Sequence, residues 1–158
     1  MIKHLKDKGY RVLCIDKEPE VTVGYTTNSI PNGCEDFTGN LPLKERVALI
    51  QHADAFIGLS SGLAWLAWCC KVPVVLISGF TDPYNEFYTP YRVHNSTVCH
   101  GCWHGLQDEF SHTDYFWCPG KTENTQKFEC TRFITAAQVA AKVDKALAAK
   151  RTGRKRSK

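Results

Sequence analysis

The sequence predicts an α/β domain in which parallel strands are covered by helices. Two apolar runs, residues 55–59 and 72–77, have the length of buried strands and are bounded by polar residues or glycine. Residues 63–70 between them are apolar around most of a helical circumference, as expected for a helix that packs between layers. Two apolar strands joined by a helix are typical of parallel pairing with both faces of the sheet covered.

Shorter elements are expected before this strand–helix–strand unit. Residues 2–8 are predicted to end a helix at Gly9, and residues 11–15 are predicted to form a buried strand. Residues 17–33 are polar and contain several turn residues, so we expect an irregular connection there. Because the chain opens within a helix and no strand precedes it, we expect that an upstream segment of the domain is missing.

Two helices and one strand complete the expected order. Residues 34–39 are predicted to form a short edge strand, and Asn40 is predicted to cap a helix over residues 41–52, whose apolar residues recur at helical spacing. Residues 135–149 give the clearest helix, with Thr135 as its cap and an apolar stripe along one face. We expect this last helix to pack across the sheet.

The composition is that of a globular domain. Of 158 residues, 43% are hydrophobic and 23% are charged, which suffices for a sizeable core. No apolar run is long enough to span a membrane, and the charged N-terminal segment lacks the apolar core of a signal peptide. We therefore expect a cytoplasmic location.

The net charge of +4 is unevenly distributed along the chain. Six positive charges lie in residues 150–158, and removing them leaves a net charge of −2 for the rest of the chain. This distribution predicts a globular domain over residues 1–149, followed by a basic, disordered tail. A basic surface for nucleic acid is therefore not expected on the domain itself.

Ser60, Ser61 and Gly62 follow directly on the first apolar strand and form a candidate anion site. A helix N-terminus presents unpaired N–H groups, the serine hydroxyls can donate to an anion, and Gly62 lets a ligand approach the backbone. Phosphate is the natural ligand of such a turn. The alternative is that these residues only cap the helix. The loop after the second strand, residues 78–83, is predicted to open on the same side of the sheet.

Four of the eight cysteines have the spacing of metal ligands. Cys99, Cys102, Cys118 and Cys130 form the pattern C-x2-C-x15-C-x11-C, in a loop-like region with little core of its own. A C-x2-C pair presents two thiolates from one tight turn, and two further cysteines complete a closed structural site. Composition alone favours zinc, but four thiolates also hold a single iron, so the spacing leaves the metal open. Three histidines could replace one cysteine, namely His100, His104 and His112.

Five segments are shared with one known family. They are FIGLSSGLAWLAW at residues 56–68, PVVLISGFTDPYNEF at 73–87, TPYRVHNSTVCHGCWH at 89–104, DYFWCP at 114–119 and FECTRFIT at 128–135. Through these segments the chain resembles the C-terminal half of the bacterial autotransporter (strand-loop-strand) O-heptosyltransferases, within the ADP-heptose heptosyltransferase superfamily. The resemblance covers nearly all of the chain except the basic tail, and the four-cysteine insertion makes it specific.

The resemblance implies a Rossmann-like, donor-binding C-terminal domain of a GT-B glycosyltransferase, with a metal finger inserted at residues 99–130. It implies transfer of heptose from ADP-heptose to a serine hydroxyl of an autotransporter passenger protein, with iron as the leading metal and zinc as the second. It also implies that the full-length enzyme forms a homo-oligomer. The donor-binding residues are then expected to be Ser60, Ser61, Gly62, Thr81 and Asp82.

The resemblance assigns no catalytic residue to this chain. The general base is expected in the missing N-terminal half together with the acceptor domain, so the isolated fragment is expected to be inactive. Ordinary heptosyltransferases have an acidic residue and a following histidine where this chain has Ser60 and Trp65. Backbone N–H groups are therefore expected to bind more of the phosphate.

Two other functions stay open at the level of the sequence. One is a non-catalytic module that binds a nucleotide or only assembles with a partner. The other is a zinc-knuckle protein that binds nucleic acid through residues 99–130 and the basic tail. The net charge of −2 outside that tail argues against the second alternative.

Overall fold

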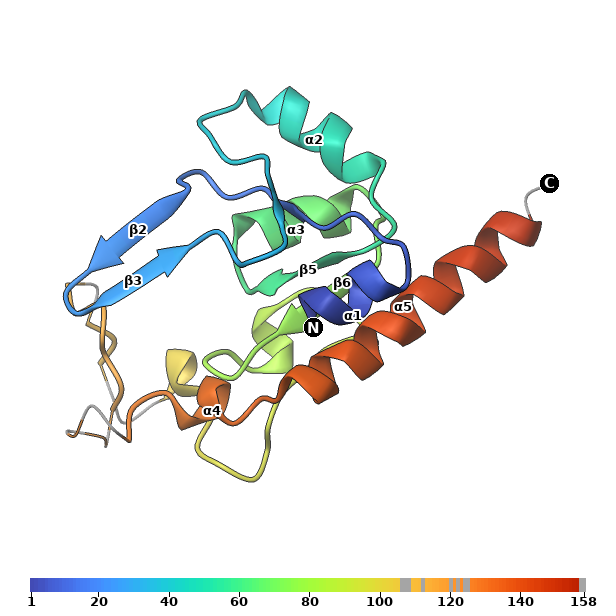
Figure 1. The fold of residues 1–158 in the computed structure, drawn as a ribbon. Coiled ribbons are helices and arrows are strands. Elements are labelled where there is room, and N and C mark those ends of the chain that lie inside the picture. Colours follow the sequence, from blue (N-terminus) through green and yellow to red (C-terminus); the bar gives the residue numbers. More distant parts are fainter. Residues whose placement is uncertain (106–108, 112, 120, 122, 124–125, 157–158) are drawn as a thin grey trace. The chain divides into compact units, whose positions relative to one another are not determined.

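The computed structural model in Figure 1 describes residues 1–105, 109–111, 113–119, 121, 123 and 126–156. The chain divides into two compact units, Met1–Leu49 and Ile50–Lys158. The first unit holds two short strand pairs, and the second holds the strand–helix–strand unit predicted from the sequence. Each unit is described by itself below.

The first unit begins with helix α1, Ile2–Asp7, and Gly9, two residues beyond its end, has φ +80°. Strands β1, Leu13–Cys14, and β4, Glu35–Asp36, then pair in parallel, with Leu13 opposite Glu35. Both strands are shorter than predicted. β4 ends early because the Thr38 N–H and hydroxyl both donate to the Asp36 carboxylate, at 2.9 and 2.7 Å, and this local turn diverts the backbone from the ladder.

The prediction of an irregular connection over residues 17–33 is wrong. The structure places a β-hairpin there, formed by β2, Glu20–Val23, and β3, Thr26–Ser29. The strands are antiparallel, and Val23 lies opposite Thr26 across a two-residue turn in which Gly24 has φ +57°. Runs of β-branched residues on both sides of a glycine-containing two-residue loop are a hairpin signal, which the nearby proline and asparagine residues obscured.

Helix α2, Leu43–Gln51, carries a buried arginine that ties the loops of the first unit together. The Arg46 guanidinium donates to the carbonyl oxygens of Phe37 at 2.9 Å and Asp16 at 2.8 Å, and also to that of Gly39. These carbonyls belong to the segments that follow β1 and β4. One charged side chain thus donates to three backbone carbonyls that lie outside the strands.

The predicted strand–helix–strand unit forms the centre of the second unit. Strands β5, Phe56–Leu59, and β6, Val74–Ile77, pair in parallel, with Phe56 opposite Val74. Helix α3, Gly62–Cys69, connects them and contacts both strands. Val93 adds a single parallel bridge to Ile77 on the other side of β6. The predicted parallel pairing is therefore confirmed and β6 is buried as expected, but β5 is only half-buried and its last residue, Leu59, is exposed.

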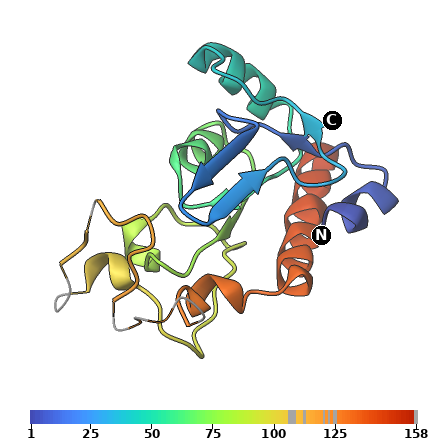
Figure 2. The ribbon, with the colours of Figure 1, turned by 60° about the vertical axis from the view of Figure 1, so that its left-hand side comes forward.

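The core of this unit is centred on β6. Val75 and Leu76 are inaccessible to solvent, and Ala64 and Ala67 of α3 are equally buried. The two alanines keep that face of α3 small, which lets its backbone approach the sheet. The last helix, α5, Ala136–Arg156, contacts β6, and Figure 2 shows the strands lying between α3 and α5.

Thr135 caps α5 as predicted. The Gln138 N–H donates to the Thr135 hydroxyl at 3.2 Å, and the Gln138 side chain accepts from the Thr135 N–H at 2.7 Å. The helix runs to Arg156, so it takes in most of residues 150–158, where we expected disorder. Lysine and arginine are good helix formers and suit the negative end of a helix dipole, which favours this continuation. Residues 157–158 lie outside the described chain.

Two further short helical elements follow β6. A 3-10 helix, η1, spans Pro83–Asn85, and another, η2, spans Cys102–His104. Helix α4 covers Glu129–Arg132 just before α5. Across the described residues, none of the helices combines the length and the apolar character needed to cross a membrane.

Replacing a core leucine of β6 tests this account of the core. Leu76→Ala is expected to lower the free energy of unfolding by about 2–5 kcal/mol, because a cavity forms where the side chain was buried. The matched control is Leu59→Ala at the end of β5, where the side chain is 58% exposed and the expected loss is below about 0.5 kcal/mol. Urea unfolding of both variants measures the difference, and equal losses would contradict this core.

Candidate functional site

The turn between β5 and α3 leaves a helix N-terminus open to solvent. Ser60, Ser61 and Gly62 are all exposed, and a Cβ atom added at Gly62 would meet nothing within 4 Å. Ser61 is the N-cap residue in an extended conformation, and no capping hydrogen bond from its side chain is found among the described residues. The Ser61 hydroxyl is therefore not engaged in capping α3 within the described structure.

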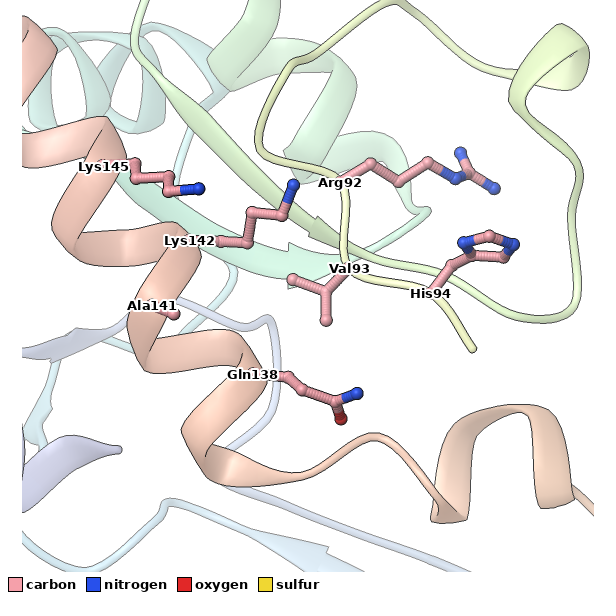
Figure 3. Close-up of a pocket in the computed structure, with 7 residues that line it drawn as sticks. All are labelled: Arg92, Val93, His94, Gln138, Ala141, Lys142 and Lys145. Carbon is pink, nitrogen blue, oxygen red and sulfur yellow. The ribbon is translucent and has the colours of Figure 1, made fainter. Parts of the chain in front are cut away.

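The loop after β6 lies at the same edge of the sheet as this turn, since β5 and β6 run in parallel. Its inner side is held by a buried ion pair between Arg92 and Glu86, whose side chains are 14% and 1% exposed. The Arg92 guanidinium also donates to the Ser78 hydroxyl at 2.8 Å and to the Thr81 carbonyl at 2.6 Å. Figure 3 shows the Arg92 side chain pointing away from α5.

Thr81 and Asp82 of this loop have different surroundings. The Thr81 hydroxyl donates to Glu86 and lies 2.9 Å from the Ser78 hydroxyl, so it serves the buried network. Asp82 is half-buried and precedes η1. Burial lowers the pKa of the Arg92 guanidinium, and the negative charge of Asp82 offsets part of that decrease. Within the described chain, Arg92 Nε is a buried donor that has no hydrogen-bond partner.

The C-x2-C turn is hydrogen-bonded to the loop after β6. Gly101 adopts the left-handed conformation, with φ +72°, and η2 begins directly after it. The Gly101 N–H donates to the Gly79 carbonyl at 2.9 Å, and the Trp103 N–H donates to the Phe80 carbonyl at 3.1 Å. A Cβ atom at Gly101 would collide with the Asp82 carboxylate.

Cys130 approaches the same loop from α4. A Cβ atom added at Gly79 would lie 2.7 Å from the Cys130 carbonyl carbon and 2.8 Å from its Cβ atom, so only glycine fits there. Burial raises the pKa of the Cys130 thiol, and Cys99 and Cys118 raise it further by electrostatic interaction. Cys130 and the C-x2-C turn therefore both contact Gly79.

The four cysteines do not form a closed cluster in this structure. All eight cysteines of the chain are described and none is in a disulfide. No group of three or more His, Cys, Asp or Glu side chains within the described residues is placed to hold a metal ion. The alternative ligand His100 has its Nδ1 atom 2.9 Å from the Val98 carbonyl oxygen, and His112 lies outside the described residues.

An aromatic cluster that sequence reasoning missed covers Phe80. Its ring centroid lies 5.4 Å from that of Trp103, 5.7 Å from that of Phe110 and 6.0 Å from that of Trp117. Phe110 also contacts both tryptophans, at 4.7 and 5.0 Å. Trp103 follows Cys102 directly and Trp117 precedes Cys118, so an aromatic neighbour at each cysteine was the available signal.

A separate cavity of about 370 Å³ opens between α5 and residues 92–94. Figure 3 shows Lys142 and Lys145 projecting from α5 toward that segment. The Lys142 ammonium donates weakly, at 3.4 Å, to the Pro90 carbonyl. None of the five predicted donor-binding residues lines this cavity.

The buried ion pair generates a stability prediction. Glu86→Gln keeps the shape of the side chain but leaves Arg92 with a buried, uncompensated charge, so unfolding is expected to require about 3–5 kcal/mol less free energy. The control is Glu35→Gln, which breaks an exposed ion pair with Arg11 and should leave the unfolding midpoint unchanged. Chemical unfolding compares the two, and a Glu86 variant as stable as the wild type would rule out this role.

Residues 1–116 match glycosyltransferase family 9 (heptosyltransferase). The chain is 56% identical over 139 residues to the autotransporter heptosyltransferase Aah of Escherichia coli, covering 88% of this chain and 36% of that protein. It is 37% identical over 137 residues to the inactive autotransporter heptosyltransferase BimC of Burkholderia thailandensis, covering 87% of this chain and 32% of that protein. The chain therefore spans about a third of the length of these relatives.

A solved structure gives the same relationship at the level of the fold. It is the dodecameric iron-containing heptosyltransferase TibC in complex with ADP-D-beta-D-heptose, which superposes with a TM-score of 0.91 at 54% identity. The match covers 94% of this chain and 39% of that chain. Sequence and fold agree, and the chain belongs to glycosyltransferase family 9, the heptosyltransferases.

Proposed function

We propose that this chain is the donor-binding part of an autotransporter heptosyltransferase. The observation that carries the proposal is the open N-terminus of α3 at the end of β5. It lies at the same edge of the sheet as the loop after β6, which the Arg92–Glu86 ion pair holds in place. A nucleotide diphosphate fits such an edge, because unpaired N–H groups and a helix dipole favour a doubly charged anion. The solved TibC complex, 54% identical, contains a nucleotide sugar of this class.

Each predicted donor-binding residue has a distinct role in this proposal. Ser60 and Ser61 donate hydroxyls to the diphosphate, and Gly62 lets it approach the backbone of α3. Asp82 orients hydroxyls of the ribose or the heptose. Thr81 contributes through the position of its backbone, because its hydroxyl is engaged inside the protein. These donors stabilise the negative charge that develops on ADP as the sugar departs.

The complete reaction is proposed to be transfer of heptose from ADP-heptose to a serine hydroxyl of an autotransporter passenger protein. The general base and the acceptor site are assigned to the part of the relatives that this sequence does not match. The isolated chain is then a binding unit without transfer activity. By the same reasoning the full-length enzyme is proposed to form a homo-oligomer, as TibC is dodecameric.

A non-catalytic role is the second candidate. BimC, which is 37% identical to this chain, is described as an inactive autotransporter heptosyltransferase. A nucleotide-binding or assembly module of this kind would keep the loops at β5 and β6 without catalysing transfer. A transfer assay on the full-length protein separates the two functions.

We also propose that Cys99, Cys102, Cys118 and Cys130 hold one structural metal ion, with iron first and zinc second. Four thiols are a suitable ligand set for either metal, and the left-handed turn at Gly101 suits a C-x2-C knuckle. Cys130 packs against Gly79, and the Gly79 carbonyl accepts from the Gly101 N–H, so the last cysteine and the C-x2-C turn meet at the same glycine. When bound, the metal would cross-link a segment that has little core, and four protein ligands leave it no position for substrate.

A charge placed at the turn tests the donor site. Gly62→Asp puts a carboxylate where the diphosphate should lie, so ADP-heptose affinity measured by calorimetry is expected to fall at least tenfold. An acidic residue in the first turn of a helix is favourable, so the fold should be retained. Ala137→Asp, in the first turn of α5, is the matched control and should bind normally. Equal affinity in both variants would reject this site.

Loss of one thiolate tests the metal site. Wild-type chain, purified under reducing conditions, should carry one iron or zinc ion per chain, and Cys118→Ser should lose it because three thiolates bind far less tightly. Cys69→Ser removes an exposed thiol of α3 and should keep the metal. Elemental analysis of each protein gives the metal content. A Cys118 variant that retained its metal would exclude this ligand set.

A further inference from the structure

We propose that metal at the four cysteines and nucleotide at the loop after β6 bind cooperatively, because the cysteine segment fixes the shape of that loop. The part of the loop concerned is residues 79–82, which follow Ser78 at the end of β6 and precede η1. The inference rests on the proposed donor and metal sites and concerns the energetic link between them. Contacts from both ends of the cysteine segment converge on this loop.

The first contact is a pair of backbone hydrogen bonds on consecutive loop residues. The carbonyls of Gly79 and Phe80 accept from Gly101 and Trp103, at 2.9 and 3.1 Å. The donors lie on either side of Cys102, so any movement of the C-x2-C turn moves the loop backbone with it. Backbone hydrogen bonds of this length have little freedom to rearrange without breaking.

The second contact is the close packing of Gly79 on Cys130. The missing side chain at Gly79 lets the Cys130 backbone lie where a Cβ atom would be, 2.7 Å from its carbonyl carbon. Gly79 thus has two contacts with the cysteine segment. Its carbonyl accepts from the C-x2-C turn, and its Cα atom packs against the last cysteine. Holding the four thiolates on one ion would keep both contacts in place at once.

The third contact is the ring cluster around Phe80. Trp103 and Trp117 flank two of the cysteines in sequence, and both stand against the Phe80 ring in edge-on geometry, at 74° and 78°. Such pairs add stabilisation beyond the area they bury. The cysteine segment therefore contacts both the Phe80 side chain and the backbone carbonyls of Gly79 and Phe80.

The fourth contact joins the segment to a proposed ligand group. The absence of a side chain at Gly101 lets the Asp82 carboxylate lie directly against the C-x2-C turn. Asp82 is the residue assigned above to the hydroxyls of the nucleotide sugar. Ordering the turn therefore also orders the carboxylate, and a loop that is already ordered loses less entropy when ligand binds.

Linkage gives this proposal a quantitative form. If metal raises the affinity for ADP by some factor, ADP must raise the affinity for metal by the same factor. We expect a factor on the order of tenfold, within the usual range for coupled sites. The metal itself does not touch the nucleotide in this scheme, so the coupling passes through Gly79, Phe80 and Asp82.

The experiment uses the whole chain with ADP and Zn²⁺ as probes. ADP affinity is measured by calorimetry on metal-free and Zn²⁺-loaded protein, and Zn²⁺ affinity is measured by chelator competition with and without ADP. Hydrogen–deuterium exchange of the peptide that covers residues 79–82 provides a readout independent of nucleotide. We expect equal coupling factors and slower exchange in the metal-loaded protein.

Two variants locate the coupling. Gly79→Ala forces the loop and the Cys130 backbone apart, so its coupling factor should fall to near one even if the Zn²⁺ affinity also falls. Phe80→Leu removes the ring contacts without a clash, and it serves if the first variant does not fold. Phe133→Leu changes an exposed ring outside the cluster and should couple normally.

The outcomes separate this inference from the proposed function. The coupling would be overturned, with both sites left in place, if metal loading changed neither the ADP affinity nor the hydrogen–deuterium exchange of residues 79–82. A chain that binds no ADP with or without metal would overturn the donor site, and the coupling with it. Loss of coupling in Gly79→Ala or Phe80→Leu, with coupling kept in Phe133→Leu, would support the pathway.

Discussion

The carboxylate of Glu86 and the guanidinium of Arg92 meet inside the protein, and the candidate site depends on that ion pair. Removing two charges from water is costly, so the pair is tolerated only because Ser78 and the Thr81 carbonyl satisfy further donors. The same bonds fasten the end of β6 to the segment that carries Val93. A purely apolar interior could stabilise the domain equally well, but it would not fix the backbone direction of the loop.

The loop is therefore held on two sides by different chemistry. Its interior side is fixed by the charged network, and its other contacts come from the backbone and rings of the cysteine segment. The residues of the turn, Ser60, Ser61 and Gly62, are exposed to solvent. One half of the proposed site is thus rigid and the other accessible, which suits a ligand that enters from solvent and must be oriented once bound.

The sequence predicts the elements whose signal is local. The apolar runs at β5 and β6, the Ser60–Gly62 turn and the Thr135 cap are correctly located, because strand period, glycine and capping chemistry act over a few residues. Arg46 could not be recognised as buried, since its partner Asp16 lies 30 residues away in the chain. Arg92 pairs with Glu86 only six residues away, but both lie in irregular segments whose spacing does not predict the contact. Cysteine spacing indicates candidate ligands but not their packing against Gly79, which only the fold reveals.

The crowding at Gly79 has a consequence for the order of folding. Its partners are Gly101 and Cys130, which both follow it in the chain, and Cys130 is the last residue of the cysteine segment. Contacts between distant residues form late because loop closure costs entropy before the contact rewards it. During synthesis, β5, α3 and β6 can assemble first, whereas the loop at Gly79 reaches its final shape only after the ribosome has released Cys130.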